Sequence, residues 1–389
     1  PYIFLISLVA LFMGILNSLR HFAAPAAAPV FLNVGIIAAI LWVSPHLSQP
    51  IVGVALGVII GGVLQVLLQI PWLLRNGLTL LPCWMPGHPA VRKIGGLMLP
   101  AIFGSAVYQV NSYIQTLLAS FLPEGSISWL YYADRLVQFP LGVFAIAVST
   151  AALPSFSRQV AEGNLEELRA TLSHTLSIVF FITTPSMVGL MVLGRPIIEV
   201  CFERGAFDAL STAMTAQALF FYALGLWAFS GTRVLISAFY AFQDTRTPVK
   251  VATAALAANL LLGLLFMAPL KHGGLALALT GASALQFALL LRYLKRRMPA
   301  WRLRPMVVAS CRSLLASGVM GLAVMGLLRV LWNAKASPGF LSQVAVLGLL
   351  LLTGVVFYLA AAWALGCREV PALLRAFGSV KIGRGRGKG

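Results

Sequence analysis

Long apolar runs follow one another along the whole chain and restrict what it can fold into. Each run is close to the ~20 residues that an α-helix needs to cross a bilayer. Hydrophobic residues make up 60% of the chain and charged residues 10%, whereas a typical soluble domain is roughly 45–50% apolar and about 25% charged. A soluble core cannot bury so much apolar surface. We therefore predict an all-α polytopic membrane protein.

Pro, Gly and charged residues divide these runs into eleven predicted transmembrane helices. The predicted spans are 2–19, 27–43, 51–74, 94–120, 128–153, 171–193, 213–240, 249–269, 273–294, 306–331 and 340–366. Because the loops are short, helices that are neighbours in sequence are expected to pack antiparallel. The segment "GVIIGG" (57–62) has glycines at helix-packing spacing and predicts a close contact between helices.

The basic residues indicate which side is cytoplasmic. When the spans alternate across the membrane, 21 of the 28 Lys and Arg residues fall on one side and five on the other, while Arg135 and Arg233 lie inside helices. Cytoplasmic loops carry an excess of Lys and Arg, so we place the C-terminus and its basic tail in the cytoplasm. The basic residues are dispersed over several segments instead of one folded face, and we expect no nucleic-acid binding.

The chain begins at Pro1, directly within an apolar run and on the side that the charges assign to the exterior. No targeting segment precedes this run. We therefore expect a fragment that lacks an odd number of upstream helices.

The loops carry cap and turn signals but no catalytic motif. Asn164, with Glu167 three residues later, forms a capping-box pattern, and Asp208 is a predicted helix cap. Asp244 favours a turn, and Pro196 is predicted to begin a short helix. Nucleophile, nucleotide-binding and zinc-hydrolase motifs are absent, and the four cysteines are scattered. We predict a transporter and not an enzyme, with no catalytic residue and no metal site.

The stretch "SWLYYADRLVQFPLG" (128–142) places two adjacent charges where a span begins. Asp134 and Arg135 point about 100° apart on a helix, so we expect no direct ion pair between them. Gln138 lies at helical spacing from both and completes a polar stripe, and Pro140 is expected to bend the helix just below it. Since charges inside a membrane are costly, we predict that this stripe lines a polar cavity.

Arg135 is the principal candidate for binding an anionic group, because its planar guanidinium matches phosphate geometry. The alternative is that it reaches outward to the membrane interface. Arg233 is a second candidate, for which the same alternative is equally consistent. Polar residues on other spans are explained as well by hydrogen bonds between helices as by a substrate path. They are Gln109, Asn111 and Gln115. Asn259 is the one strongly polar residue central in the eighth predicted span, and by itself it does not indicate an ion site.

Five stretches resemble the MurJ (MviN) lipid II flippases. They are "RHFAAPAAAPVFLNVGII", "WLYYADRLVQFPLGVFAIAVSTAALPSFSR", "FERGAFD", "AFYAFQDTRTPVK" and "APLKHGGLALAL". These stretches occur in the order typical of the family, and the last two spans resemble its extra C-terminal pair of helices. The stretches are long and specific.

The resemblance implies the fold of the multidrug, oligosaccharidyl-lipid and polysaccharide exporter superfamily, with fourteen helices in two six-helix lobes and an added pair. The first three helices would then be missing from this chain. Residues 1–92 would form the second half of the N-terminal lobe, with three helices. Residues 93–298 would form the C-terminal lobe, with six, and residues 299–389 the added pair and the basic cytoplasmic tail.

The resemblance also implies a function: alternating access that flips lipid II, the undecaprenyl-pyrophosphate-linked peptidoglycan precursor, from the cytoplasmic to the outer leaflet of the bacterial inner membrane. Arg135 matches the motif arginine and Asp134 its neighbouring acid, while the position of Gln138 is often acidic in relatives. Such arginines are thought to hold the pyrophosphate in a cavity between the lobes. The family's other key basic residues lie in the missing helices, so we do not expect the chain to transport by itself.

The expected partners are lipid II and membrane lipids, with cell-wall synthesis proteins as further candidates, and we expect a monomer. No cofactor is expected, beyond dependence on the membrane potential or a coupling ion. The nearest alternative is a polysaccharide-lipid or multidrug exporter of the same fold. A lipid-modifying enzyme or a scaffold would need a reactive constellation or a docking domain, and the sequence shows neither.

Overall fold

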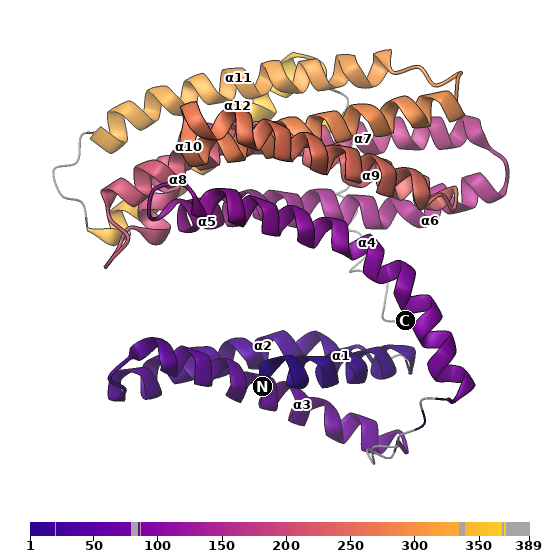
Figure 1. Cartoon of the computed structure of the whole chain (residues 1–389). Helices are drawn as coiled ribbons and strands as arrows, with labels where there is room; N and C mark the ends of the chain where they lie inside the picture. Colours follow the sequence, from indigo (N-terminus) through magenta and orange to yellow (C-terminus); the bar gives the residue numbers. More distant parts are fainter. Residues whose placement is uncertain (20, 79–84, 86, 334–338, 368, 371–389) are drawn as a thin grey trace, which may run out of the picture. The chain divides into compact units, whose positions relative to one another are not determined.

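The computed structural model describes residues 1–19, 21–78, 85, 87–333, 339–367 and 369–370, and all regular elements within them are helices. The chain divides into two compact units, Pro1–Gly95 (unit 1) and Gly96–Gly389 (unit 2), which are considered separately (Figure 1). The lobe assignments 1–92, 93–298 and 299–389 stay predictions. Most of the basic tail and Cys83 lie outside the described residues.

Unit 1 is built on a close contact between two helices. It contains α1 (Tyr2–Ser18), α2 (Ala23–Ala38) with the short continuations η1 (Ala39–Val43) and η2 (Ser44–His46), and α3 (Pro50–Arg75). A Cβ added at Gly35 of α2 would lie 2.6 Å from the Cα of Gly61 in α3, so the two backbones nearly touch. Gln65 of α3 also donates from Nε2 to the Ala28 carbonyl of α2 at 3.0 Å. The close contact predicted for residues 57–62 is confirmed.

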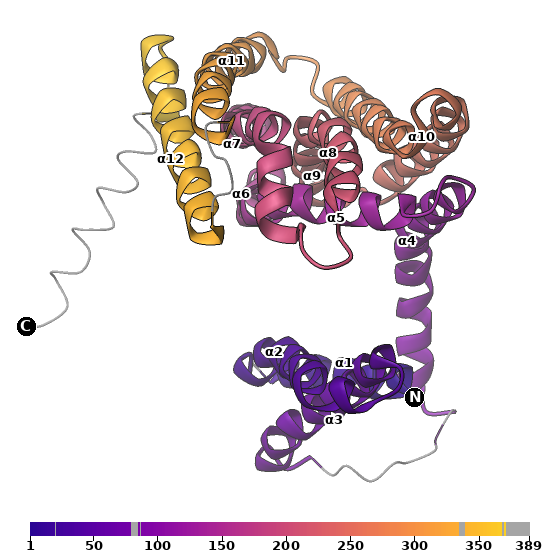
Figure 2. The same ribbon diagram turned by 90° about the vertical axis from the view of Figure 1, so that its left-hand side faces the viewer.

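Unit 2 holds the longer part of the chain. Its helices are α4 (Pro89–Ser120), which begins before the unit boundary, α5 (Ser126–Pro140), η3 (Leu141–Ile146), α6 (Ala147–Ala161), α7 (Leu165–Phe202), α8 (Ala209–Ala223), α9 (Leu226–Ala241), α10 (Arg246–Arg297), α11 (Arg304–Asn333) and α12 (Phe340–Ala364). One apolar cluster joins α4 through α10, and a second joins α7, α11 and α12. Figure 2 shows α11 and α12 beside α7, on the side of unit 2 away from α10.

The helices agree with the predicted class of protein. Every one of the predicted apolar spans overlaps a helix. By length and hydropathy, seven helices in the described residues can cross a membrane, or eight if α8 and α9, which meet at a bend of 44°, form one span. The chain is a multi-pass α-helical membrane protein. The count of eleven crossings stays a prediction, because α1 has only 17 residues and α10 merges two predicted spans.

α10 is interrupted at Lys271, whose φ of 51° and ψ of −131° are not helical. A positive φ is uncommon for a residue with a side chain. After this break, Gly274 lies so close to the Phe266 carbonyl that a Cβ would overlap it. The two halves of α10 therefore fold back on each other, at the position where the sequence separates spans 249–269 and 273–294.

The predicted caps are present. Asn164 Oδ1 accepts the Glu167 backbone N–H at 3.1 Å, and Asp208 Oδ1 accepts that of Ser211 at 2.8 Å. These two bonds satisfy donors at the starts of α7 and α8 that have no partner within the helix. Both cap predictions are confirmed.

Asp244 fixes the turn between α9 and α10. Its carboxylate accepts from the Thr247 backbone N–H at 3.0 Å and the Thr247 hydroxyl at 2.8 Å, and it pairs with Arg297 at 3.2 Å. Burial raises the pKa of Asp244, but the Thr247 hydrogen bonds and the Arg297 charge outweigh it, so the pKa lies below its ordinary value. The predicted turn is confirmed.

The prediction that a short helix begins at Pro196 is wrong. α7 runs without interruption through this residue to Phe202. Pro196 has no N–H and leaves one carbonyl of the preceding turn without its helical donor. Pro196, Ile198 and Val200 are nevertheless buried. Packing of these side chains therefore outweighs the lost hydrogen bond.

A second proline in α7 explains how α12 attaches. Pro185 lacks an N–H, so the Phe181 carbonyl four residues earlier has no helical donor. Tyr358 of α12 donates its hydroxyl to that carbonyl at 2.5 Å, and the same hydroxyl lies 2.8 Å from Ser313 Oγ of α11. Phe181, Ser313 and Tyr358 are all buried. Three helices thus meet at one hydrogen-bonded point in apolar surroundings.

Candidate functional site

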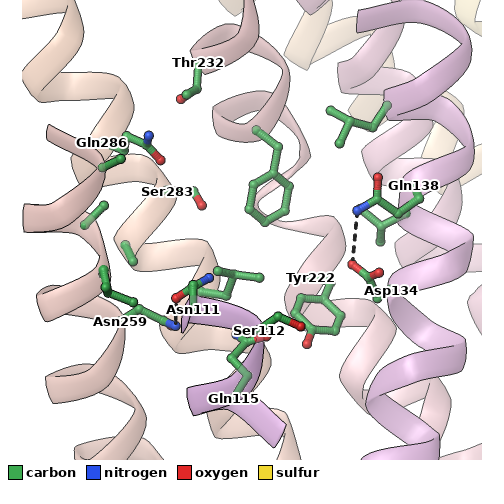
Figure 3. A pocket seen from close by; sticks show the side chains of 18 of the residues that line it. Asn111, Ser112, Gln115, Asp134, Gln138, Tyr222, Thr232, Asn259, Ser283 and Gln286 are labelled. Carbon is green, nitrogen blue, oxygen red and sulfur yellow. Dashed lines mark hydrogen bonds between the residues drawn. The ribbon is translucent and has the colours of Figure 1, made fainter. Parts of the chain in front are cut away.

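Unit 2 contains a polar cavity of about 500 Å³ among α4, α5, α8, α9 and α10 (Figure 3). Its polar lining comes from every one of these helices. The lining residues include Asn111, Ser112, Gln115 and Thr116 of α4; Asp134 and Gln138 of α5; Tyr222 of α8; Thr232 and Arg233 of α9; and Asn259, Ser283 and Gln286 of α10. The lipid around a membrane protein is apolar, so a polar lining of this kind provides a place for a polar group inside the membrane.

α5 presents Asp134 and Gln138 to the cavity because the two residues are one helical turn apart. Gln138 Nε2 lies 3.5 Å from Asp134 Oδ1, and Figure 3 shows both side chains on the same wall. Ala133 and Val137, on an adjacent face, are buried. The predicted bend at Pro140 coincides with a change of helix geometry, since the π-helical segment η3 begins at the next residue.

Arg135 lies outside this cavity lining. Its side chain is exposed in unit 2, and its guanidinium carbon lies 4.7 Å from the centroid of the Tyr131 ring. A cation over the face of an aromatic ring is attracted to it, so this contact favours a guanidinium position beside Tyr131. In the described part of the chain Asp134 and Arg135 form no ion pair with each other, as predicted. The anion-binding role of Arg135 stays a prediction.

Arg233 is a cavity residue, together with its neighbour Thr232. Within the described lining, Arg233 is the single base and Asp134 the single acid. The cavity is therefore close to electrically neutral, and most of its polar groups are amides and hydroxyls. The substrate-binding role of Arg233 also stays a prediction.

Asn111 and Asn259 connect two walls of the cavity. Asn259 Nδ2 donates to Asn111 Oδ1 at 2.8 Å, which joins α10 to α4. Among the described residues, Asn259 Oδ1, Gln115 Nε2 and Thr232 Oγ1 are buried without a hydrogen-bond partner. The interhelical hydrogen bond offered as one explanation for Asn111 is therefore present, and Asn111 and Asn259 both line the cavity. The substrate path stays a prediction.

Sequence reasoning missed Thr232, Ser283 and Gln286. Each is an isolated neutral polar residue on an apolar helix, a pattern that usually indicates a local structural hydrogen bond. The available signal was the spacing of Ser283 and Gln286, three residues apart on one face of a span.

The described residues contain no group of three His, Cys, Asp or Glu side chains close enough to hold a metal ion. Cys201, Cys311 and Cys367 are free thiols.

Comparison with known proteins connects this architecture to one family. The family model "Lipid II flippase MurJ" matches residues 1–347. The chain is 39% identical over 356 residues to the "Probable lipid II flippase MurJ" of Vibrio cholerae, covering 92% of this chain and 67% of the relative. It is 35% identical over 376 residues to the "Lipid II flippase MurJ" of Burkholderia cenocepacia, covering 94% of this chain and 72% of that protein.

Solved structures show the same relationship. The structure described as "Lipid II flippase MurJ, inward closed conformation" superimposes with a TM-score of 0.74 at 25% identity. The superposition covers 93% of this chain and 71% of the other. The family match, the identities and the shared fold agree, and the chain belongs to the lipid II flippase MurJ family.

Proposed function

We propose that this chain acts in the transport of lipid II across the bacterial inner membrane, as a flippase and not as an enzyme. The observation that supports this most strongly is the family match over residues 1–347. Family membership favours lipid II over the substrates of drug or polysaccharide-lipid exporters of the same fold. The polar cavity of unit 2 adds a physical reason, because a head group of sugars, peptide and pyrophosphate cannot cross hydrocarbon unaided.

Different charged residues would bind different parts of this head group. We propose that Arg135 and Arg233 bind the pyrophosphate through charge-assisted hydrogen bonds. Asp134 and Gln138 would bind uncharged donors of the head group, because a carboxylate repels phosphate. The Tyr131 ring keeps the Arg135 guanidinium at one position, which lowers the entropic cost of binding an anion there.

Alternating access would come from rocking of the two lobes of the family's fold. The membrane potential, worth ~2.3 kcal/mol per charge per 100 mV, would act on the arginines and reset the carrier without a cofactor. A coupling ion is the other candidate energy source. We also propose that the protein is a monomer. Its C-terminus would be cytoplasmic, which the distribution of Lys and Arg supports.

The test of the proposed function measures binding of lipid II to the purified chain in lipid nanodiscs. Arg135→Ala and Arg233→Ala should each weaken binding by about tenfold to a hundredfold, since a hydrogen bond to a charged group contributes about 1.5–3 kcal/mol. Arg158→Ala is the matched control, because Arg158 is an exposed residue of α6 that pairs only with Glu162 in the described structure.

A chain that reaches the membrane but binds no lipid II would contradict the proposal. So would an Arg135→Leu variant that binds lipid II as tightly as the unmodified chain.

A further inference from the structure

A second hollow in unit 2 lies at the C-terminal end of α10, away from the polar cavity. It is an open groove of about 640 Å³ lined by Ala288, Leu291, Arg292, Lys295, Arg296, Pro299 and Leu303. We propose that this groove binds an anionic phospholipid of the surrounding membrane, with the phosphate held by Arg292, Lys295 and Arg296. An acyl chain would lie along Ala288, Leu291 and Leu303.

The order of residues along α10 supports this occupant. Ala288, Leu291, Arg292 and Lys295 recur at helical spacing and form one face of the helix. Along that face the apolar residues come first and the cations follow near the helix end. A phospholipid at the edge of a bilayer has the same arrangement, with chains in the hydrocarbon and phosphate at the interface. The groove is therefore complementary to a lipid both in polarity and in charge.

The three cations are not neutralised by the protein. In the described structure Arg292, Lys295 and Arg296 are exposed, and neither ion pair of the described residues includes any of them. None of the described residues that line the groove is acidic. Arg297 behaves differently, since its guanidinium pairs with Asp244 at 3.2 Å and lies 4.7 Å from the centroid of the Phe242 ring. Of four nearby basic residues, three thus remain available for an anion.

The far wall of the groove is held in place by contacts with the rest of unit 2. The segment that follows α10 contains Pro299 and Leu303, and between them the buried Trp301 donates from Nε1 to Ser173 Oγ of α7 at 2.7 Å. Met298, also buried, donates its N–H to the Leu294 carbonyl at 3.0 Å. A site with two held walls costs less entropy on binding than a disordered basic segment does.

Basic residues at a helix C-terminus also have an ordinary explanation, because they stabilise the helix dipole and mark the cytoplasmic side. That explanation predicts that any cytoplasmic cation attracts anionic lipid equally. The proposed site predicts that position matters, and the two can be separated by experiment.

The experiment measures binding of phosphatidylglycerol, with phosphatidylcholine as reference, to the purified chain by native mass spectrometry. One variant combines Arg292→Gln, Lys295→Gln and Arg296→Gln. The control combines Lys250→Gln, Arg302→Gln and Arg304→Gln. These are exposed cations on the same predicted side that do not line the groove. Both variants lose the same charge.

The groove variant should lose phosphatidylglycerol affinity roughly tenfold or more, while the control changes by less than about twofold. Ala288→Trp, which fills the apolar part without removing charge, should also weaken binding. Circular dichroism and the midpoint of thermal unfolding establish that each variant is folded.

Three results would overturn the proposal. Equal losses in the groove and control variants would show general attraction of anionic lipid to cations. An unchanged groove variant would show that phosphatidylglycerol binds elsewhere. Displacement of phosphatidylglycerol from the groove by equimolar lipid II would show that the groove belongs to the transported lipid. The first two outcomes do not bear on lipid II binding by Arg135 and Arg233, so the two proposals can fail separately.

Discussion

The hydrogen bond between Tyr358 and Phe181 gives a sharp prediction about how α12 attaches to α7. Tyr358→Phe removes only the hydroxyl, and it leaves the Phe181 carbonyl and Ser313 Oγ buried without this partner. A buried unsatisfied polar group costs about 1–3 kcal/mol. Hydrogen bonds between membrane helices average only about 0.6 kcal/mol, because separated helices find other partners.

The Phe181 carbonyl lacks such an alternative. Pro185 supplies no N–H within α7, so this carbonyl stays unpaired whenever Tyr358 moves away. We therefore expect Tyr358→Phe to lower the free energy of unfolding by about 1–2 kcal/mol, above the membrane average. This is about a 5- to 30-fold change in the folding equilibrium. The measurement is reversible unfolding of the purified chain in mixed detergent micelles with increasing sodium dodecyl sulfate.

A double-mutant cycle tests the reasoning. Pro185→Ala restores an N–H that can bond the Phe181 carbonyl, so Tyr358→Phe should cost clearly less in that background. Tyr293→Phe, at an exposed tyrosine of α10, is the matched control and should change the unfolding free energy by less than about 0.5 kcal/mol. If Tyr358→Phe costs the same with and without Pro185, the orphaned carbonyl is not the reason that the tyrosine stabilises the fold.

Three further changes test other contacts by unfolding of the purified chain. Gly35→Ala should destabilise unit 1 by about 1–3 kcal/mol, because its Cβ would lie 2.6 Å from backbone of α3; Gly14→Ala, which has nothing within 4 Å, should not. Thr280→Val should cost about 1 kcal/mol, since Thr280 donates at 2.8 Å to the Phe221 carbonyl beside the bend between α8 and α9. The pKa of Asp244 is lowered in the folded protein, so its carboxylate stabilises the fold above the unfolded pKa of about 3.9, and this contribution disappears as the pH falls through the lower folded value. Asp244→Asn should therefore be less stable at pH 7 by under about 1 kcal/mol, and equal stability losses at pH 7 and pH 3 would contradict this assignment.

The apolar runs predicted the helices well, because the bilayer requires spans of one length and forbids unpaired backbone inside it. Caps at Asn164 and Asp208 were equally predictable, since a short polar side chain before an apolar run satisfies the free N–H groups of the first turn. The prediction at Pro196 failed because a proline signals only the local loss of a donor. The burial of Ile198 and Val200, which continues the helix, depends on neighbours far away in the sequence.

The cavity was less predictable than the helices. Helical geometry placed Asp134 and Gln138 on one wall, and that wall is found in the structure. The same geometry separates Arg135 from Asp134 but cannot say which of the two faces the cavity. Its opposite wall is made by isolated residues such as Ser283 and Gln286, whose role appears only when α10 has folded.

The conformation of Lys271 decides whether this cavity can exist at all. If α10 were one straight rod rising ~1.5 Å per residue, Asn259 and Gln286 would be about 40 Å apart, more than the thickness of the hydrocarbon layer. They share one small chamber because the chain reverses direction at a single backbone position. The spacing of opposite walls thus depends on the backbone of one residue that lies outside the cavity lining.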